Sequence, residues 1–227
     1  MYLYNENKEK FNYILDNQNI IGEGEYGIVY KLNYDTCLKL YYNNEPINRD
    51  ILSVIRNLKL QNYYRIYDFL YDYKSNFKAH TMKYYKQEQL DILTMPTIYT
   101  LNNLFNLLMD IDTLNKNNIL ISDMHTGNVI LGYSEITIID ADLYKFNNLY
   151  RADTLKYKNL SSLGHLLEQI YLEALTEYHS ELKSKEVVET IKNLFQFQNK
   201  FNCEEPFRML EKYYYPIDYI KRRIKIK

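Results

Sequence analysis

The sequence predicts an α+β protein with a small β-rich N-terminal part and a larger α-rich C-terminal part. In the first third of the chain, short β-branched or aromatic runs alternate with glycines and an Asn-Tyr-Asp turn signal, which is typical of antiparallel strands. From Gln89 onward, the apolar residues recur at helical spacing. We place the division after Tyr85, which gives an N-terminal part of residues 1–85 and a C-terminal part of residues 86–227.

Five antiparallel strands and one helix are expected in the N-terminal part. The strands follow the runs NIIGEGE, GIVYKL, TCLKLYY, YYRIYDFLYD and FKAHTMKYY. Between the third and fourth runs lies EPINRDILSVIRNLKL, whose Pro46 stands where the first turn of a helix is expected, a position at which proline is favoured. Its apolar residues form a single stripe at helical spacing: Ile47, Ile51, Val54, Ile55 and Leu58. This segment is therefore expected to be an amphipathic helix beside the sheet.

The C-terminal part is expected to be mainly helical. Its two clearest helices are LNNLFNLLMDIDTLNKN and SSLGHLLEQIYLEALTEY. Between them, ILISDMHTGNVIL and EITIIDADLY indicate two short strands that end in acidic or amide side chains. The basic tail, KRRIKIK, is expected to be a solvated end, with contact to an anion or a membrane surface as the alternative. A cleft between the two parts is the default place for a functional site.

Composition and charge narrow the class of protein. Hydrophobic residues make up 46% of the 227 residues and charged residues 25%, as in ordinary globular chains. The net charge of -1 gives no overall field that would attract nucleic acid or an anionic membrane. Cys37 and Cys203 are far apart, which indicates a reducing compartment and argues against a disulfide scaffold. Because no apolar run has membrane-spanning length, we expect a cytoplasmic protein, although an effector translocated into another cell would have the same features.

Two features of the N-terminal part indicate phosphate binding. The run IGEGEYGIVYK holds three of the six glycines, Gly22, Gly24 and Gly27. Glycine lets backbone N–H groups approach phosphate oxygens, although a tight turn between strands also favours it. The run lies between two strands, so it lacks the helix N-terminus of a dinucleotide fingerprint. Lys39, in TCLKLYY, lies among apolar residues, and burial of its ammonium group is costly unless an anion pairs with it. The alternative interpretation is that the side chain extends to solvent at the edge of the sheet.

Two features of the C-terminal part indicate phosphoryl transfer. SDMHTGN places Asp123 and Asn128 on a turn directly after an apolar strand, and IIDAD places Asp140 at the end of another strand. One carboxylate that orients a hydroxyl, with an amide and a second carboxylate that share a divalent ion, suits an in-line displacement at phosphorus. Each residue alone could serve a turn, since Asp and Asn are favoured there. The ordered combination with the glycine run and Lys39 favours the catalytic interpretation.

These segments together resemble the protein-kinase-like superfamily. IGEGEYGIVYK is similar to its glycine-rich loop, CLK to the strand with the phosphate-pairing lysine, SDMHTGN to the catalytic loop D-x-x-x-x-N, and DAD to the magnesium-binding D-F-G. SSLGHLL and EEPFRMLEKY resemble two helical segments of the C-terminal lobe. The resemblance implies a bilobal protein-kinase-like fold with a shortened C-terminal lobe. It also implies a phosphotransferase that depends on ATP and Mg²⁺.

The resemblance implies roles for individual residues. The three glycines would cover the triphosphate, and Lys39 would pair with its α- and β-phosphates. Asn128 and Asp140 would hold magnesium, Asp123 would orient the acceptor hydroxyl, and Asp142 could add a metal-binding carboxylate. The adenine would lie between Val29, Cys37 and Ile130, and hinge hydrogen bonds would come from Met82, Lys83 and the chain up to Tyr85. Asp50 is the first choice for the acid that fixes Lys39, and Glu45 is the second.

The sequence also departs from the family pattern. Ile121 and Ser122 replace the usual His-Arg before the catalytic Asp, so control through phosphorylation of an activation loop is not expected. Ala141 and Asp142 replace Phe and Gly, and no A-P-E-like segment is present. D-x-H-x-x-N, with His125, is similar to the loop of aminoglycoside and choline phosphotransferases; His125 either takes part in catalysis or braces the loop.

Several functions stay open at this point. The leading expectation is transfer of the γ-phosphate of ATP to a protein Ser or Thr hydroxyl, with Tyr as a weaker option. A small-molecule kinase that acts on aminoglycoside-like or choline-like alcohols is the first alternative. A non-catalytic nucleotide-binding protein and a nucleotidyl transferase are the others. The sequence does not indicate an oligomeric state.

Overall fold

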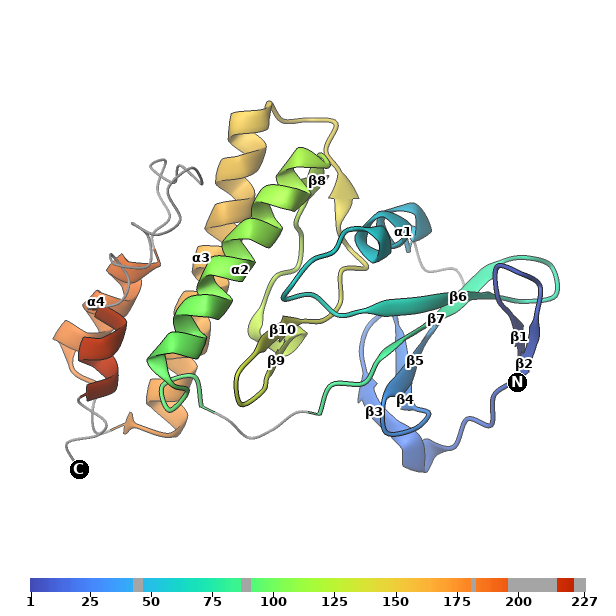
Figure 1. The fold of residues 1–227 in the computed structure, drawn as a ribbon, viewed down its shortest axis with the longest axis horizontal. Helices are drawn as coiled ribbons and strands as arrows, with labels where there is room; N and C mark the ends of the chain where they lie inside the picture. Colours follow the sequence, from blue (N-terminus) through green and yellow to red (C-terminus); the bar gives the residue numbers. More distant parts are fainter. Residues whose placement is uncertain (43–46, 87–90, 181–182, 196–215, 223–227) are drawn as a thin grey trace. The chain divides into compact units, whose positions relative to one another are not determined.

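The computed structural model is of mixed α+β composition, as the sequence predicts (Figure 1). It describes residues 1–42, 47–86, 91–180, 183–195 and 216–222. The chain forms two compact units: Met1–Asn57 with Tyr64–Lys86, and Leu58–Tyr63 with Gln87–Lys227. The short segment Leu58–Tyr63 therefore groups with the second unit, although the sequence-based division assigned it to the N-terminal part.

The first unit contains a seven-stranded antiparallel sheet in the order β2-β1-β6-β7-β5-β4-β3. Its strands are β1 Tyr2–Tyr4, β2 Lys10–Asn12, β3 Ile20–Glu23, β4 Gly27–Lys31, β5 Thr36–Tyr41, β6 Ile66–Tyr71 and β7 Phe77–Lys83. A 3-10 turn, η1, covers Asn17–Asn19. The five expected strands form, but the expected total of five is wrong. Strands β1 and β2 form an additional hairpin that extends the sheet beyond β6 through the pairing of Tyr4 with Tyr71.

The two faces of this sheet bury different side chains. One face carries a cluster of buried residues: Leu3, Tyr30, Leu38, Leu70 and Ala79. Phe69 precedes Leu70 on β6 and therefore points to the opposite face. Two arginines of helix α1 (Arg49–Asn57) lie over its ring, with the Arg56 guanidinium 4.5 Å from the ring centroid. Pro46, the expected start of this helix, lies outside the described residues.

Hydrogen bonds explain why Leu58–Tyr63 belongs to the second unit. The backbone N–H groups of Gln61 and Asn62 both donate to the buried carboxylate of Asp110, at 2.9 and 2.8 Å. The Asn62 side chain donates to Asn103 Oδ1 at 2.7 Å and to the carbonyl oxygen of Ile136 at 2.6 Å. Burial raises the pKa of Asp110 to about 6, although the two N–H donors act in the opposite direction.

The second unit is built around two long helices, α2 (Thr97–Lys116) and α3 (Ala152–Glu177), which lie side by side (Figure 1). Its remaining elements are β8 Ile119–Leu120, the 3-10 turn η2 Thr126–Asn128, β9 Val129–Leu131, β10 Ile136–Ile138, β11 Lys145–Phe146 and α4 Lys185–Leu194. Strand β9 pairs with β10, and β8 with β11. Helix α3 begins well before the expected start at Ser161, so it also contains the polar run that precedes SSLG.

The C-terminal residues differ from expectation where they are described. Residues 216–222 are helical, and Lys221 is buried, so the beginning of the basic tail is not fully solvated. The Lys221 ammonium donates to the carbonyl oxygen of Ile92 at 3.0 Å and to Thr100 Oγ1 at 2.9 Å, which compensates for its burial. The segment EEPFRMLEKY and Cys203 lie outside the described residues. None of the described helices combines the length and apolar character needed to cross a bilayer.

Candidate active site

The glycine-rich run of the first unit forms the end of β3, the turn after it and the start of β4. The Gly24 N–H donates to the carbonyl oxygen of Gly27 at 3.0 Å and closes this turn. A Cβ atom on Gly27 would overlap the carbonyl oxygen of Leu40 on the neighbouring strand β5, so the packing of the sheet itself requires this glycine. A Cβ on Gly24 would meet nothing within 4 Å, and one on Gly22 would make only ordinary contacts with Val29. Packing therefore explains Gly27 and leaves Gly22 and Gly24 without a structural requirement.

Lys39 lies in the middle of β5, opposite Val29 on β4 and His80 on β7. Only 7% of its surface is exposed, so its side chain does not reach out to solvent at the edge of the sheet. Its Nζ is 5.8 Å from the ring centroid of Tyr41, two residues along the same face of the strand. Burial of an ammonium group is favourable only where anionic or polar groups meet it.

The structure does not bring Asp50 together with Lys39. Asp50 is in the first turn of α1, its side chain is 79% exposed, and its carboxylate pairs with Arg49 at 3.7 Å. The buried face of the helix carries Ile51, Leu52 and Ile55 instead, so the helical period turns Asp50 to solvent. Glu45, the second choice, lies outside the described residues.

The residues expected around the adenine are partly connected in the first unit. Cys37 is buried, and its Sγ lies 3.7 and 3.6 Å from the carbonyl oxygens of Met82 and Lys83. Burial raises the pKa of the Cys37 thiol to about 12, so it stays neutral near pH 7. The Lys83 N–H donates to the carbonyl oxygen of Arg65 at 2.9 Å, so a hinge hydrogen bond to a ligand through this donor would have to share or replace that bond. The Lys83 Nζ lies 4.9 Å from the ring centroid of Tyr85, which is half-buried.

The predicted catalytic loop of the second unit is held together by Asn128. The Asn128 Nδ2 donates to the backbone oxygen of Asp123 at 2.9 Å and lies 3.4 Å from its Oδ2. The backbone oxygen of Asn128 accepts the N–H of Ile139 at 2.8 Å, which places the loop beside the residue that precedes Asp140. Asn128 therefore links the two acidic residues that the sequence predicts to work together. The Asn128 side-chain amide therefore turns its nitrogen toward Asp123 and its oxygen away from Asp123.

Asp123 and Asp140 share an unusual backbone conformation. Their φ angles are 60° and 71°, in the left-handed region that residues with side chains rarely adopt. The other described non-glycine residues with positive φ are Lys8, Ser75 and Asn118. Such conformations cost free energy and persist where the surrounding structure enforces them, frequently at functional sites. The Asp123 side chain is 45% exposed, so its carboxylate is accessible from solvent.

His125 caps the 3-10 turn that follows Asp123. Its Nδ1 accepts the Gly127 N–H at 3.1 Å, and its Nε2 lies 3.6 Å from Asp123 Oδ1. Because an acceptor nitrogen carries no proton, this cap requires a neutral ring with the proton on Nε2, directed toward Asp123. A Cβ on Gly127 would lie 2.9 Å from His125 Cε1, which explains the glycine. The brace expected for His125 is therefore present, and its other ring nitrogen is near Asp123.

The metal-binding set predicted from DAD is only partly assembled. The Asp140 Oδ1 accepts the backbone N–H of Asp142 at 3.2 Å, and Asp142 itself is buried, with 2% of its surface exposed. Across the part of the chain that the structure describes, no group of three or more His, Cys, Asp or Glu residues is arranged to hold a metal ion. The amide oxygen of Asn128 and the carboxylate of Asp140 are hard oxygen ligands of the kind that Mg²⁺ prefers. Ile130, expected beside the adenine, is half-buried on β9.

One positioning residue was missed by sequence reasoning. Asn159, on α3, is fully buried, and its Oδ1 accepts the backbone N–H of Ile121 at 2.9 Å. Its Nδ2 donates to the carbonyl oxygen of Ile119 at 2.8 Å and to Asn115 Oδ1 at 2.7 Å. These bonds fix the segment that leads into Asp123. The signal in the sequence was an asparagine four residues after Leu155, within the apolar stripe of a helix.

Comparison of the chain with protein-family models and with curated proteins gave no match. The case for a function therefore depends on the arrangement of the side chains in each unit. In the first unit these are the glycine turn and the buried Lys39. In the second unit they are Asp123, on a loop fastened by Asn128, and Asp140, which follows the residue bound by the Asn128 backbone oxygen.

Proposed function

We propose that this protein transfers the γ-phosphate of ATP to an alcohol hydroxyl in a magnesium-dependent reaction. The observation that carries the proposal is the arrangement around Asn128: its amide holds Asp123, and its backbone oxygen holds the residue before Asp140. Both aspartates have left-handed backbone conformations: Asp123 on the loop that Asn159 and Asn128 hold, and Asp140 on the turn that follows β10. Turns that only connect strands do not require acidic residues in this conformation.

In the proposed reaction, Asp123 binds the acceptor hydroxyl. Its carboxylate orients the hydroxyl oxygen toward the γ-phosphorus and accepts the proton as the new O–P bond forms. The bond between the γ-phosphorus and the β–γ bridging oxygen breaks, and ADP leaves with that oxygen. The hydrogen bond from Asn128 and the nearby Nε2 of His125 keep the Asp123 carboxylate in one orientation.

Asn128 and Asp140 are the residues that would hold the magnesium ion. The Asn128 Nδ2 donates to Asp123, so its amide oxygen is directed elsewhere and can serve as a ligand. Magnesium held there would neutralise charge on the phosphate oxygens. In the first unit, Lys39 supplies a buried positive charge for the α- and β-phosphates, and the turn at Gly22 and Gly24 lets backbone N–H groups approach them.

A protein Ser or Thr hydroxyl is the leading acceptor, and one structural observation favours a small-molecule alcohol instead. Helix α3 already begins at Ala152, so only residues 141–151 separate Asp140 from it. If the helix began at Ser161, as the sequence predicts, the connecting segment would be longer. The short segment that is present offers little surface for a peptide to dock against. Small-molecule acceptors need no such surface, because they bind in a pocket.

Transfer of radiolabel from ATP tests this proposal. The protein is incubated with magnesium and ATP labelled at the γ-phosphate, together with a protein lysate or with a panel of aminoglycoside-like and choline-like alcohols. We expect label on an acceptor, and a loss of about a hundredfold or more in Asp123→Asn and Asp140→Asn. Asp153→Asn is the matched control, because Asp153 is an exposed carboxylate in the first turn of α3.

The same assay separates the competing functions. If label appears on small alcohols and on no protein, the acceptor is a small-molecule alcohol and not a protein Ser or Thr hydroxyl. Incorporation of label from the α-phosphate would identify a nucleotidyl transferase. Equal transfer by the parent protein and the Asp123→Asn variant, or no transfer to any acceptor despite tight ATP binding, would contradict catalysis and leave a nucleotide-binding role.

A further inference from the structure

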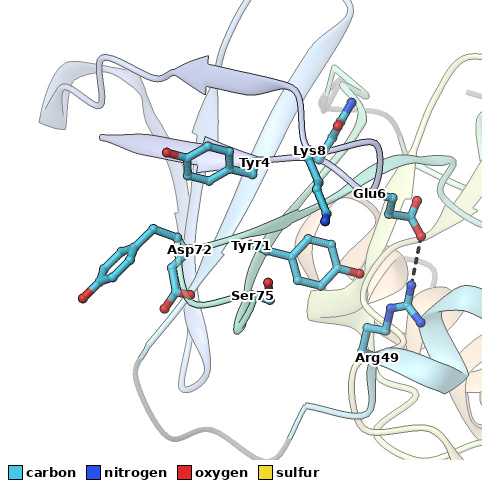
Figure 2. A pocket seen from close by; sticks show the side chains of 9 residues that line it. Tyr4, Glu6, Lys8, Arg49, Tyr71, Asp72 and Ser75 are labelled. Atoms are coloured by element: carbon cyan, nitrogen blue, oxygen red, sulfur yellow. Dashed lines mark hydrogen bonds and ion pairs between the residues drawn. The ribbon is translucent and has the colours of Figure 1, made fainter.

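A hollow of about 600 Å³ opens in the first unit (Figure 2). It is bounded by the β1–β2 hairpin, the turn that joins β6 to β7, and Arg49 at the start of α1. Strands β1 and β6 lie toward one edge of the sheet, whereas β3 and β4 form the opposite edge. The hollow is thus separate from the residues proposed to bind ATP. Its volume falls within the roughly 300–1,000 Å³ range of small-molecule sites.

The two acidic side chains of the hollow are already engaged by the protein. Glu6 accepts from Arg49 Nη2 at 2.9 Å and from Arg56 Nη1 at 2.6 Å, and these bonds lower the pKa of its carboxyl. Asp72 accepts the backbone N–H groups of Lys74 and Asn76 at 2.8 and 2.9 Å, and these bonds belong to its own turn. Neither carboxylate therefore needs a ligand to complete its hydrogen bonds.

The polar groups left over in the hollow are donors. No hydrogen bond or ion pair with another described residue engages the Lys8 ammonium, and Figure 2 shows the Lys8 side chain extending toward Tyr71. The Nε–H of Arg49 is buried, and within the described residues it has no hydrogen-bond acceptor. The hydroxyl of Ser75 also faces this space (Figure 2). Lys8 and Ser75 are exposed to the hollow, so a ligand there that brings acceptors or negative charge can pair with these donors.

Aromatic rings supply most of the remaining lining. Tyr4 and Tyr71 come from the paired strands β1 and β6, where they are directly opposite each other. Tyrosine rings of this kind bind flat apolar groups and leave their hydroxyl groups available for hydrogen bonds. We propose that the hollow is a binding site for a small molecule that carries both an aromatic ring and an anionic group. The anionic group contacts Lys8 and Arg49, and the ring packs against Tyr71.

Such a ligand would connect elements that are otherwise joined mainly by the Glu6–Arg49 and Glu6–Arg56 ion pairs. It would contact the hairpin through Lys8 and Tyr4, and the start of α1 through Arg49. Binding is therefore expected to raise the melting temperature of the full-length protein by mass action. This inference does not depend on phosphate transfer, because it uses none of the residues assigned to ATP.

Titration calorimetry on the full chain tests the proposal, with phenyl phosphate as the probe. Inorganic phosphate and benzyl alcohol serve as partial probes, because each carries only one of the two features. We expect phenyl phosphate to bind more tightly than either partial probe. Lys8→Gln is expected to weaken its binding about tenfold, which is the effect of losing one charge-assisted contact. Lys10→Gln is the matched control: Lys10 is on the same hairpin, but its amine lies over the Tyr2 ring and outside the hollow.

Each alternative result bears on the proposal. An equal loss in Lys8→Gln and Lys10→Gln would overturn it, because a diffuse positive charge would then explain binding. If inorganic phosphate bound as tightly as phenyl phosphate, the proposal that the site binds an aromatic ring would be overturned. If a non-hydrolysable ATP analogue displaced phenyl phosphate, the phenyl phosphate would occupy the proposed ATP site and not the hollow, which would overturn the proposal. Circular dichroism of both variants checks that they are folded, so a lost signal cannot come from unfolding.

Discussion

His125 is the residue whose two ring nitrogens have separable roles. Its Nδ1 holds the Gly127 N–H, and its Nε2 faces the Asp123 carboxylate at 3.6 Å. An asparagine at this position can place an oxygen near the Nδ1 position, whereas a glutamine can place an amide near the Nε2 position. The two substitutions therefore remove the two contacts one at a time.

We expect His125→Asn to keep the cap and the stability of the loop but to slow phosphate transfer about tenfold, because Asp123 loses its neighbour. His125→Gln should lower the free energy of unfolding by about 1 kcal/mol, because the Gly127 N–H loses its acceptor. Urea unfolding and the labelling assay measure the two effects. Full transfer by His125→Asn would show that His125 only braces the loop.

Asp110 gives a prediction about pH and stability. Its pKa is raised to about 6 by burial, above the value of about 4 in an unfolded chain. Between these two values the folded protein binds more protons than the unfolded one, so the contribution of Asp110 to stability is greatest below about pH 4 and is lost as the pH rises through 6. Asp110→Asn keeps an acceptor for Gln61 and Asn62 but cannot ionise.

Relative to the parent protein, the Asp110→Asn variant is expected to gain about 2 kcal/mol in free energy of unfolding between pH 4 and pH 7. Urea unfolding of both proteins across this pH range measures the difference in free energy of unfolding. The contributions of titratable groups that both proteins share cancel in this difference. A difference that stays constant with pH would contradict the raised pKa.

Single residues differ in how far the sequence could predict them. Lys39 is chemically unusual in the middle of a strand, and Asp123 and Asn128 stand out by their spacing, so the sequence could select them as candidates. The acid beside Lys39 could not be chosen in this way, because helical phase decides which residue faces the sheet, and it turns Asp50 to solvent. Asn159 is revealed only by its three buried hydrogen bonds, which depend on tertiary packing.

At the scale of elements, the β3–β4 hairpin contains two kinds of glycine. Gly27→Ala should lower the free energy of unfolding by about 1–3 kcal/mol, because its Cβ meets the backbone oxygen of Leu40, which cannot move without distorting β5. Gly24→Ala should leave stability within about 0.5 kcal/mol, because its Cβ meets open space.

Binding of a non-hydrolysable ATP analogue should separate the same two glycines. Gly24→Ala is expected to weaken it despite normal stability, since a side chain there would keep the phosphates away from the backbone. Similar destabilisation by both substitutions would contradict the packing argument. Unchanged binding by Gly24→Ala would argue against a phosphate contact at this turn.

Elements with a long apolar pattern were predicted well, and short ones were not. Strands β3 to β7 and helix α1 lie within the runs that the sequence indicates, and helix α2 begins at Thr97, four residues before its run. Strands β1 and β2 have three residues each, too few to show a period, and they form because Leu3 is buried and the hairpin pairs with β6. The first turns of α3 are polar, so the apolar pattern placed its start too late.

At the scale of the whole molecule, the proposed function requires both units to act on one nucleotide. In that proposal, the first unit would supply Lys39 and the glycine turn, and the second would supply Asp123, Asn128 and Asp140. Each unit is internally suited to its proposed role, because Lys39 is buried on a strand and the acidic loop is fastened from α3. Their joint action is the central claim, and it can be tested without knowing the acceptor.

The most direct test is calorimetric titration of a magnesium-bound, non-hydrolysable ATP analogue into the parent protein and into Lys39→Met and Asp140→Asn. We predict one site per chain and a loss in affinity of about tenfold or more in each variant, although the two residues belong to different units. Lys10→Met and Asp153→Asn, which change a charge of the same sign in the same units, should bind like the parent. Normal binding by either Lys39→Met or Asp140→Asn would contradict the joint action of the two units.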